Sequence, residues 1–144
     1  MGTEPIFYWH IHHGILAEPL AEPVGNRIRF IRENKPAKEV ETRLRLMRPV
    51  RGKLPAKLAK ARQACDEAKR ALDEAGRAYA DAARGGRGEA RRAYEKRWLD
   101  LGKMRWALEQ ALRASRPEIE ALHKLECPGC PWDGETIFPN GRTQ

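Results

Sequence analysis

The chain has 144 residues, with 28 Lys or Arg against 20 Asp or Glu, and therefore a formal net charge of +8. Its length fits one domain, or one domain with an arm, and its 33% charged and 41% hydrophobic residues are typical of a chain rich in exposed helix. It has no apolar run of about 18 residues to span a membrane, and residues 1–5 lack the basic start of a signal peptide. Three cysteines, an odd number, indicate a reducing compartment. We expect a cytoplasmic protein and exclude membrane proteins, secreted mini-proteins and large two-domain enzymes.

Residues 1–53 are predicted to form the N-terminal part of a small base. Ile6–His12 has the pattern of a short strand, while Glu22–Glu33 and Pro36–Met47 place apolar residues at helical spacing. A second strand is predicted at Thr136–Phe138, and the two strands could pair as a two-stranded patch.

Residues 54–115 predict a long antiparallel helical hairpin, so that the expected fold is mainly α. The first helix carries residues alternately four and three apart, as in a coiled-coil seam, from Leu54 through Leu58, Ala61, Cys65, Ala68, Leu72, Ala75 and Tyr79 to Ala82. Glycines in the tip at 84–88 stop this helix and permit a reversal. A second apolar stripe runs from Ala90 to Leu112, and we expect four aromatic residues to fix the register: Tyr79, Tyr94, Trp98 and Trp106.

Residues 116–144 are predicted to complete the base with a short helix and a Cys-x2-Cys knuckle. His123 and Cys127 are four apart near a helix end and so share a face, and Cys127 and Cys130 can hold one metal through two sulfurs. A fourth ligand is expected from the other end of the chain, from one of His10, His12 and His13. Imidazole together with thiolate favours Zn²⁺, in a structural role. The alternatives are free thiols in a Pro-rich turn, or a redox-active pair; the latter is disfavoured because Cys127 follows a helix instead of opening one.

The segment His10-Ile11-His12 resembles the metal-binding strand of the HUH nucleases, which cut single-stranded DNA with a tyrosine nucleophile. The resemblance implies His10 and His12 as metal ligands on one face of a strand and Tyr79 or Tyr94 as the nucleophile. That family has a sheet of four or five strands, whereas this sequence predicts two. A metal-dependent single-strand nuclease is therefore kept only as the alternative interpretation. The sequence has no phosphate loop and no nucleophile elbow, and our leading expectation is a protein without enzyme activity.

Basic residues gather at two places on the predicted hairpin. We call the first group the neck (Arg51, Lys53, Lys57 and Lys60) and the second the tip (Arg84, Arg87, Arg91 and Arg92). Both could contact phosphates, because Lys and Arg neutralise them without a precise fold. The alternative is a solvated helix surface, since acidic residues such as Asp66 and Asp81 alternate with the basic ones.

Segments 9–13, 43–55 and 126–138 look like parts of small open reading frames of bacteriophage or environmental-virus type, which have no assigned activity and carry an Ala-rich helical insert of variable length. The resemblance covers most of the chain and implies a module with an adjustable arm. The sequence therefore predicts a non-enzymatic, zinc-stabilised binding or assembly protein. Its expected partner is a protein, such as a second copy, or nucleic acid; neither a membrane nor a small-molecule substrate is expected.

Overall fold

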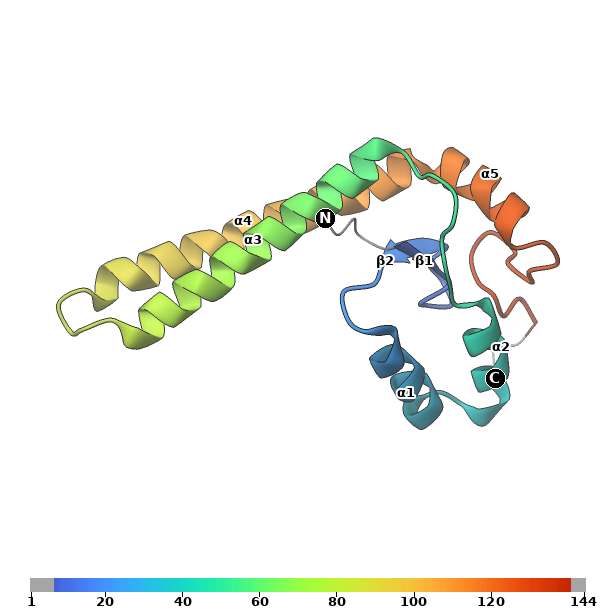
Figure 1. The fold of residues 1–144 in the computed structure, drawn as a ribbon, viewed down its shortest axis with the longest axis horizontal. Helices are drawn as coiled ribbons and strands as arrows, with labels where there is room; N and C mark the ends of the chain where they lie inside the picture. The colour runs from blue at the N-terminus through green and yellow to red at the C-terminus, as the bar shows by residue number, and fades with distance from the viewer. Residues whose placement is uncertain (1–6, 141–144) are drawn as a thin grey trace. The chain divides into compact units, whose positions relative to one another are not determined.

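The computed structural model describes residues 7–140 and is mainly α, as predicted (Figure 1). Two compact units are present. We call the first the base, which contains the residues up to Leu54 and from Arg116 onward, and the second the arm, Pro55–Ser115. The elements in chain order are β1 (Phe7–Trp9), β2 (Ala17–Pro19), α1 (Val24–Asn34), α2 (Ala37–Leu46), β3 (Arg48–Pro49), α3 (Ala56–Asp81), α4 (Arg87–Ala114) and α5 (Arg116–Glu126).

The base contains a small antiparallel sheet with strand order β2-β1-β3. Trp9 of β1 pairs with Ala17 on one side and with Arg48 on the other. The edge strands end in Pro19 and Pro49, which fits the restriction of proline to sheet edges, where a missing N–H breaks no ladder. The sheet holds β1 in place by both of its edges.

The predicted two-stranded patch is wrong in two respects. Among residues 7–140 the sheet has three strands, and Thr136–Phe138 is not one of them, although the Ile137 N–H donates to the His13 carbonyl at 3.0 Å. The predicted strand Ile6–His12 is also shorter, because β1 ends at Trp9 and His10 adopts a left-handed φ of 54°. Its first residue, Ile6, lies outside the described residues.

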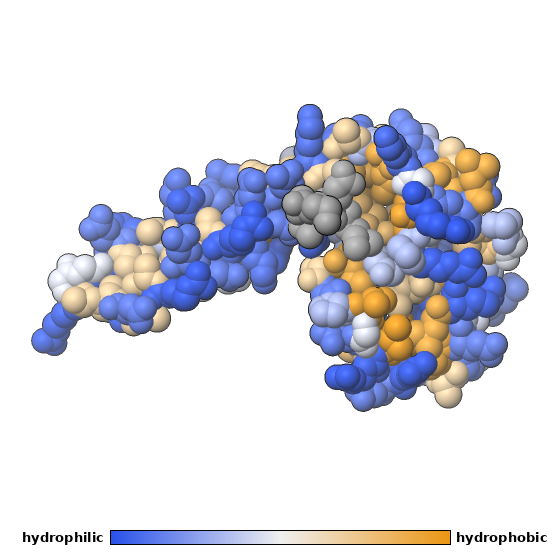
Figure 2. All heavy atoms as spheres, viewed as in Figure 1, coloured by the Kyte–Doolittle hydropathy of each residue, from blue (hydrophilic) through white to orange (hydrophobic). Residues whose placement is uncertain are grey.

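A hydrophobic core lies between the sheet and the first two helices of the base. Ile11, Ile31 and Met47 are buried at its centre, with Tyr8 and Val40 among the residues packed around them. Figure 2 shows hydrophobic side chains also at the surface of the base near α1 and α2. This core is small, so the base depends on additional contacts between its N- and C-terminal segments.

The arm is an antiparallel pair of long helices, α3 and α4, which run side by side (Figure 1). The predicted seam appears as buried residues seven apart on α3, namely Leu58, Cys65 and Leu72. The tip loop occupies 82–86, so that the Arg87 and Gly88 of the predicted tip begin α4. A Cβ at Gly76 would lie 3.2 Å from the Tyr94 ring, so this glycine makes room for the aromatic side chain.

Three of the four aromatic residues expected to fix the register form a chain of ring contacts. Tyr79 and Tyr94 have ring centroids 5.8 Å apart across the hairpin, and Trp98 meets Tyr94 edge-on at 6.3 Å. Trp106 does not take this role, because 65% of its side chain is exposed.

Candidate metal centre

The end of α5 brings together three of the four side chains of the centre. His123 lies on the buried face of the helix, in its last turn. The Cys127 N–H donates to the His123 carbonyl at 2.8 Å, which continues the helical turn and sets Cys127 beside His123. Gly129 then adopts a φ of +77°, a conformation that glycine takes without strain. The turn closes with a hydrogen bond from the Cys130 N–H to the Cys127 carbonyl, at 3.2 Å.

His10 provides the fourth side chain, from the opposite end of the chain. The left-handed conformation of His10 ends β1, and its N–H donates to the Leu16 carbonyl at 3.0 Å, which closes the turn before β2. Its imidazole is 1% exposed and lies edge-on to the His123 ring, with centroids 5.0 Å apart. The sheet thus fixes a histidine against the end of α5.

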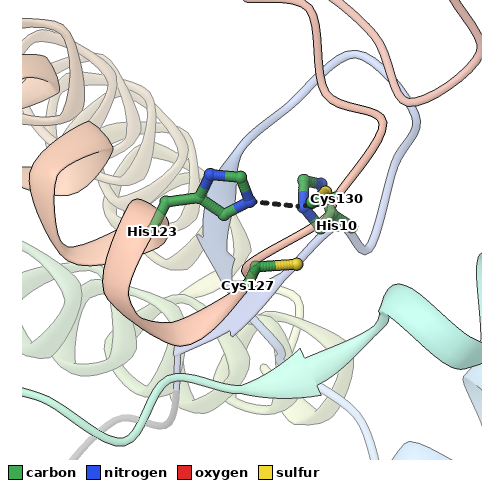
Figure 3. A group of neighbouring side chains, drawn as sticks. All are labelled: His10, His123, Cys127 and Cys130. Carbon is green, nitrogen blue, oxygen red and sulfur yellow. Dashed lines mark hydrogen bonds between the residues drawn. The ribbon is translucent and has the colours of Figure 1, made fainter.

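The ligand atoms of His10, His123, Cys127 and Cys130 all lie within 4.8 Å of one another (Figure 3). The two Nε2 atoms are 3.0 Å apart, and the Cys130 Sγ lies 3.3 Å from the His10 Nε2. Ligand atoms at ~2.0–2.1 Å (N) and ~2.3 Å (S) from a tetrahedral zinc ion are roughly 3.3–3.8 Å apart. The cluster could therefore hold a metal ion after side-chain shifts of a few tenths of an ångström up to about an ångström.

Burial keeps both imidazoles in the form that binds a metal. Burial and then the neighbouring His123 lower the pKa of His10 to about 4, and burial also lowers the pKa of His123, against the opposing effect of Glu120. Both rings are therefore neutral at pH 7 and have a lone pair to donate.

The thiols show the opposite tendency. Burial raises the pKa of Cys130 to about 11; the Trp132 N–H opposes this shift, while the adjacent Cys127 thiol adds to it. The protein alone thus offers little to stabilise a thiolate here. A divalent cation would supply the missing positive charge, because a coordinating thiol is deprotonated outright.

Aromatic rings enclose the cluster on two sides, and a pocket opens on another. The Trp9 ring lies 5.2 Å from that of His123, and the Trp132 ring lies 5.7 Å from that of His10. The pocket, of about 400 Å³, is lined by His123, both cysteines, Trp132 and the polar side chains of Glu120 and Lys124. Within residues 7–140 the Nδ1 of His10 has no hydrogen-bond partner. Aromatic rings therefore shield part of the cluster, and the pocket leaves His123 and both cysteines reachable.

Glu126, which immediately precedes Cys127, fastens this region to the rest of the base. Its carboxylate accepts hydrogen bonds from the Trp9 indole (3.1 Å), the Arg51 N–H (2.8 Å) and the Gly52 N–H (2.6 Å). Partial burial acts to raise the pKa of Glu126, but these three donors and the Arg51 charge hold it below its usual range. Sequence reasoning missed Trp9 and Glu126, because nothing in their spacing indicates a pairing across the chain.

The other two predicted histidine ligands lie elsewhere. His12 pairs through Nδ1 with the Glu18 carboxylate and is exposed, while the His13 Nδ1 lies 3.1 Å from the Thr136 Oγ1. His10 and His12 therefore turn to different partners, and their convergence on one strand face, which the HUH resemblance requires, is not observed. The two candidate tyrosines, Tyr79 and Tyr94, pack against each other in the arm.

All residues of the neck and the tip are exposed. Two tip residues already have partners within the arm: the Arg87 guanidinium lies 4.7 Å from the Tyr79 ring centroid, and the Arg91 Nε contacts Glu95 at 3.0 Å. Arg84 and Arg92 contribute exposed positive charge at the same end of the hairpin.

The chain matches no protein-family model, no curated protein and no solved structure. Among the described helices, none is both long and apolar enough to cross a membrane. Function must therefore be inferred from the histidine–cysteine cluster and from the surface of the arm.

Proposed function

We propose that this protein is a non-enzymatic binding or assembly protein whose base is stabilised by a structural zinc ion. The observation that carries the proposal is the convergence of two imidazole nitrogens and two cysteine sulfurs within 4.8 Å. A set of two nitrogens and two sulfurs suits zinc better than hard cations, which prefer oxygen. Four protein ligands would leave no open coordination position, which is typical of a structural site and not of a catalytic one.

Zinc in this position would join the two ends of the base. His10 and His123 are 113 residues apart in the chain, and the core around Ile31 is small. A metal bound by the folded chain adds its binding free energy to folding, because the unfolded chain has no preformed site. The ion would therefore maintain the base, and the inserted arm would supply the surface that meets a partner.

The exposed basic residues of the neck and the tip support nucleic acid as one class of partner, and the exposed apolar side chains of Trp98, Leu99 and Trp106 on the arm support a protein. The alternative function, an HUH-type nuclease that uses His10 and His12, has less support because His12 pairs with Glu18.

Metal analysis of ligand variants tests the zinc proposal. We expect about one zinc ion per chain in the purified protein, as a single tetrahedral site requires. The variants Cys127→Ser and Cys130→Ser should bind no zinc and should melt at a lower temperature than the wild type, whereas Cys65→Ala should keep its zinc. Cys65 is the matched control, since it is the third cysteine and is buried in the arm.

Cobalt gives an independent reading of the same site. Co²⁺ bound by two thiolates and two imidazoles in a tetrahedral arrangement should show intense visible absorption, lost in both ligand variants. A protein purified without chelators that carries no zinc, and takes up neither zinc nor cobalt on titration, would contradict the proposal.

A further inference from the structure

The side of α4 that does not pack against α3 exposes large apolar side chains. Trp98, Leu99 and Trp106 are 49%, 68% and 65% exposed, while Leu101 is buried in the hairpin. Gly102 lies midway between the two tryptophans, and a Cβ added there would meet no atom within 4 Å. We call this surface the outer α4 face.

The residues of the outer α4 face other than Leu99 are arranged symmetrically about Gly102; the counterpart of Leu99, three residues beyond Gly102, is the exposed Arg105. Tryptophans lie four residues to either side, Glu95 and Glu109 seven residues to either side, and Arg91 and Arg113 eleven residues to either side. Steps of four, seven and eleven residues are each close to a whole number of helical turns, so these side chains share one face. Each end carries an ion pair, Arg91–Glu95 at 3.0 Å and Arg113–Glu109 at 2.9 Å.

We propose that the outer α4 face binds a second copy of this chain, through an antiparallel two-fold contact centred on Gly102. A two-fold interface must be complementary to itself, because the same patch faces its own copy. The two tryptophans meet this condition, because the contact places Trp98 of one protomer beside the partner's Trp106, and the reverse. The charged residues at the two ends would face their like in the partner, but each is paired within its own protomer, and the two helices diverge away from a crossing at Gly102. The inference rests on the proposed function, since it names the partner of the arm, but it does not depend on the metal.

Gly102 allows the two helices to approach closely at the centre of this contact. Trp98, Gly102 and Trp106 form a row of residues four apart, the ridge that packs into the matching groove when two helices cross at roughly −50°. Trp98 is held ready by its edge-on contact with Tyr94. Beside it lies a groove of about 470 Å³, in whose lining Leu72 and Leu101 lie among charged side chains of both helices, those of Lys69, Asp73, Arg77 and Arg105.

The charge of the outer α4 face favours a protein over nucleic acid. Two arginines and two glutamates pair with each other at its ends, so the ends carry no net charge, and the exposed Arg105 adds one positive charge at the edge of the face, although the whole chain carries +8. Nucleic-acid binding requires unpaired positive charge for the phosphates. Three apolar side chains per protomer make a small interface, so the dimer should be weak, with a Kd on the order of 10–100 µM.

Sedimentation velocity of the full, metal-loaded chain from about 1 to about 500 µM tests this inference, since the range brackets the expected Kd. We expect a reversible monomer–dimer equilibrium. Trp106→Lys should raise the dimer Kd at least about tenfold, because two added charges would be buried near the partner's apolar residues. Ala107→Lys is the matched control: it adds the same charge at an exposed position, about 100° further round the helix, and should leave the Kd unchanged.

Gly102→Leu separates assembly from folding. The substitution removes a poor helix former from an open position, so helicity and melting temperature of the arm should hold or rise, while the added side chain should block the close crossing and weaken the dimer.

A chain that stays monomeric at the highest concentration, or a dimer that Trp106→Lys leaves intact, would overturn the inference. So would a monomer whose affinity for a single-stranded oligonucleotide falls in Trp106→Lys, since the tryptophans would then stack on bases. Zinc content measured on the same samples reports on the metal site independently.

Discussion

At the residue scale, the carboxylate of Glu126 links three segments of the base through hydrogen bonds to Trp9, Arg51 and Gly52. In Glu126→Gln, one carboxylate oxygen becomes an NH2 group, which faces an N–H donor instead of accepting from it. Hydrogen bonds to a charged group contribute about 1.5–3 kcal/mol each, so we expect the free energy of unfolding of the base to fall by about 2 kcal/mol. Urea denaturation followed by tryptophan fluorescence measures it.

Glu118→Gln is the control for this variant, because Glu118 is an exposed glutamate on the same helix. It should change the free energy of unfolding by less than about 0.5 kcal/mol. Equal effects of the two substitutions would show that the Glu126 hydrogen bonds contribute no more than a surface charge does.

Three of the four candidate metal ligands could be predicted individually from the sequence, and the fourth only as one of three histidines. The spacing of His123, Cys127 and Cys130 indicated one face of a helix end and a knuckle, and these three residues do converge. The choice among the N-terminal histidines could not be made, because strand alternation assumed that Ile6–His12 is extended throughout. The left-handed turn at His10 breaks that alternation, and it depends on the pairing of β1 with β2, which is a tertiary interaction.

At the element scale, the seam of the hairpin is what joins α3 to α4. In Leu72→Asp, a charge without a partner would replace an apolar side chain that is 6% exposed. Burial of an unpaired charge together with the loss of the leucine should cost about 4 kcal/mol. We expect the helical circular dichroism of the arm to be largely lost while the zinc content stays at its wild-type level, because the arm is a separate compact unit.

The exposed position Ala78 provides the control on the same helix. Ala78→Asp lowers helix propensity by a similar amount but buries no charge, so it should cost less than about 1 kcal/mol. If Leu72→Asp kept full helicity and melting temperature, the packing of α3 against α4 described above would be wrong.

The elements of the arm were predictable because the heptad pattern repeats over many turns, each of which adds evidence. The edge strands were not, because β2 and β3 are two or three residues long and contain proline, which normally argues against a strand. Their place at the sheet edges, where proline is tolerated, follows from the pairing with β1 and has no local signal. Trp106 was misjudged although the sequence carried a signal: it lies two residues after Met104 and two before Leu108, off the apolar stripe from Ala90 to Leu112, and it is exposed.

At the scale of the whole molecule, the basic residues behind the net charge of +8 differ in whether an acidic residue lies next to them. Many basic residues are neutralised nearby, as in the pairs Arg62–Asp66, Arg97–Asp100 and Arg116–Glu120. The tip differs, because Arg84 and Arg92 project exposed charge beside Arg87. If the chain binds nucleic acid, we therefore expect the phosphate contacts to concentrate at the tip and not on the outer α4 face.

Substitution of Arg84, Arg87 and Arg92 together by Glu tests this expectation and leaves Arg91 to its pair with Glu95. The affinity of the wild type for DNA or RNA should fall steeply with salt, by about 0.9 units of log–log slope for each duplex phosphate contacted. Loss of three contacts should lower that slope by up to about 2.7 and weaken binding to all sequences alike, since contacts to phosphate carry no base information. Fluorescence anisotropy with labelled oligonucleotides over a salt series measures both quantities.

The matched control changes three exposed basic residues of the base, Arg29, Arg32 and Lys38, to Glu. Both triple variants have a net charge of +2, because each substitution removes two units from +8. If binding depends on the tip, the control should keep most of the wild-type slope; if only net charge matters, the two variants should lose affinity equally. Absence of wild-type binding at ~50 mM salt, where such electrostatic binding is strong, would leave the exposed arginines as a solvated surface. The arm would then act through protein contact alone.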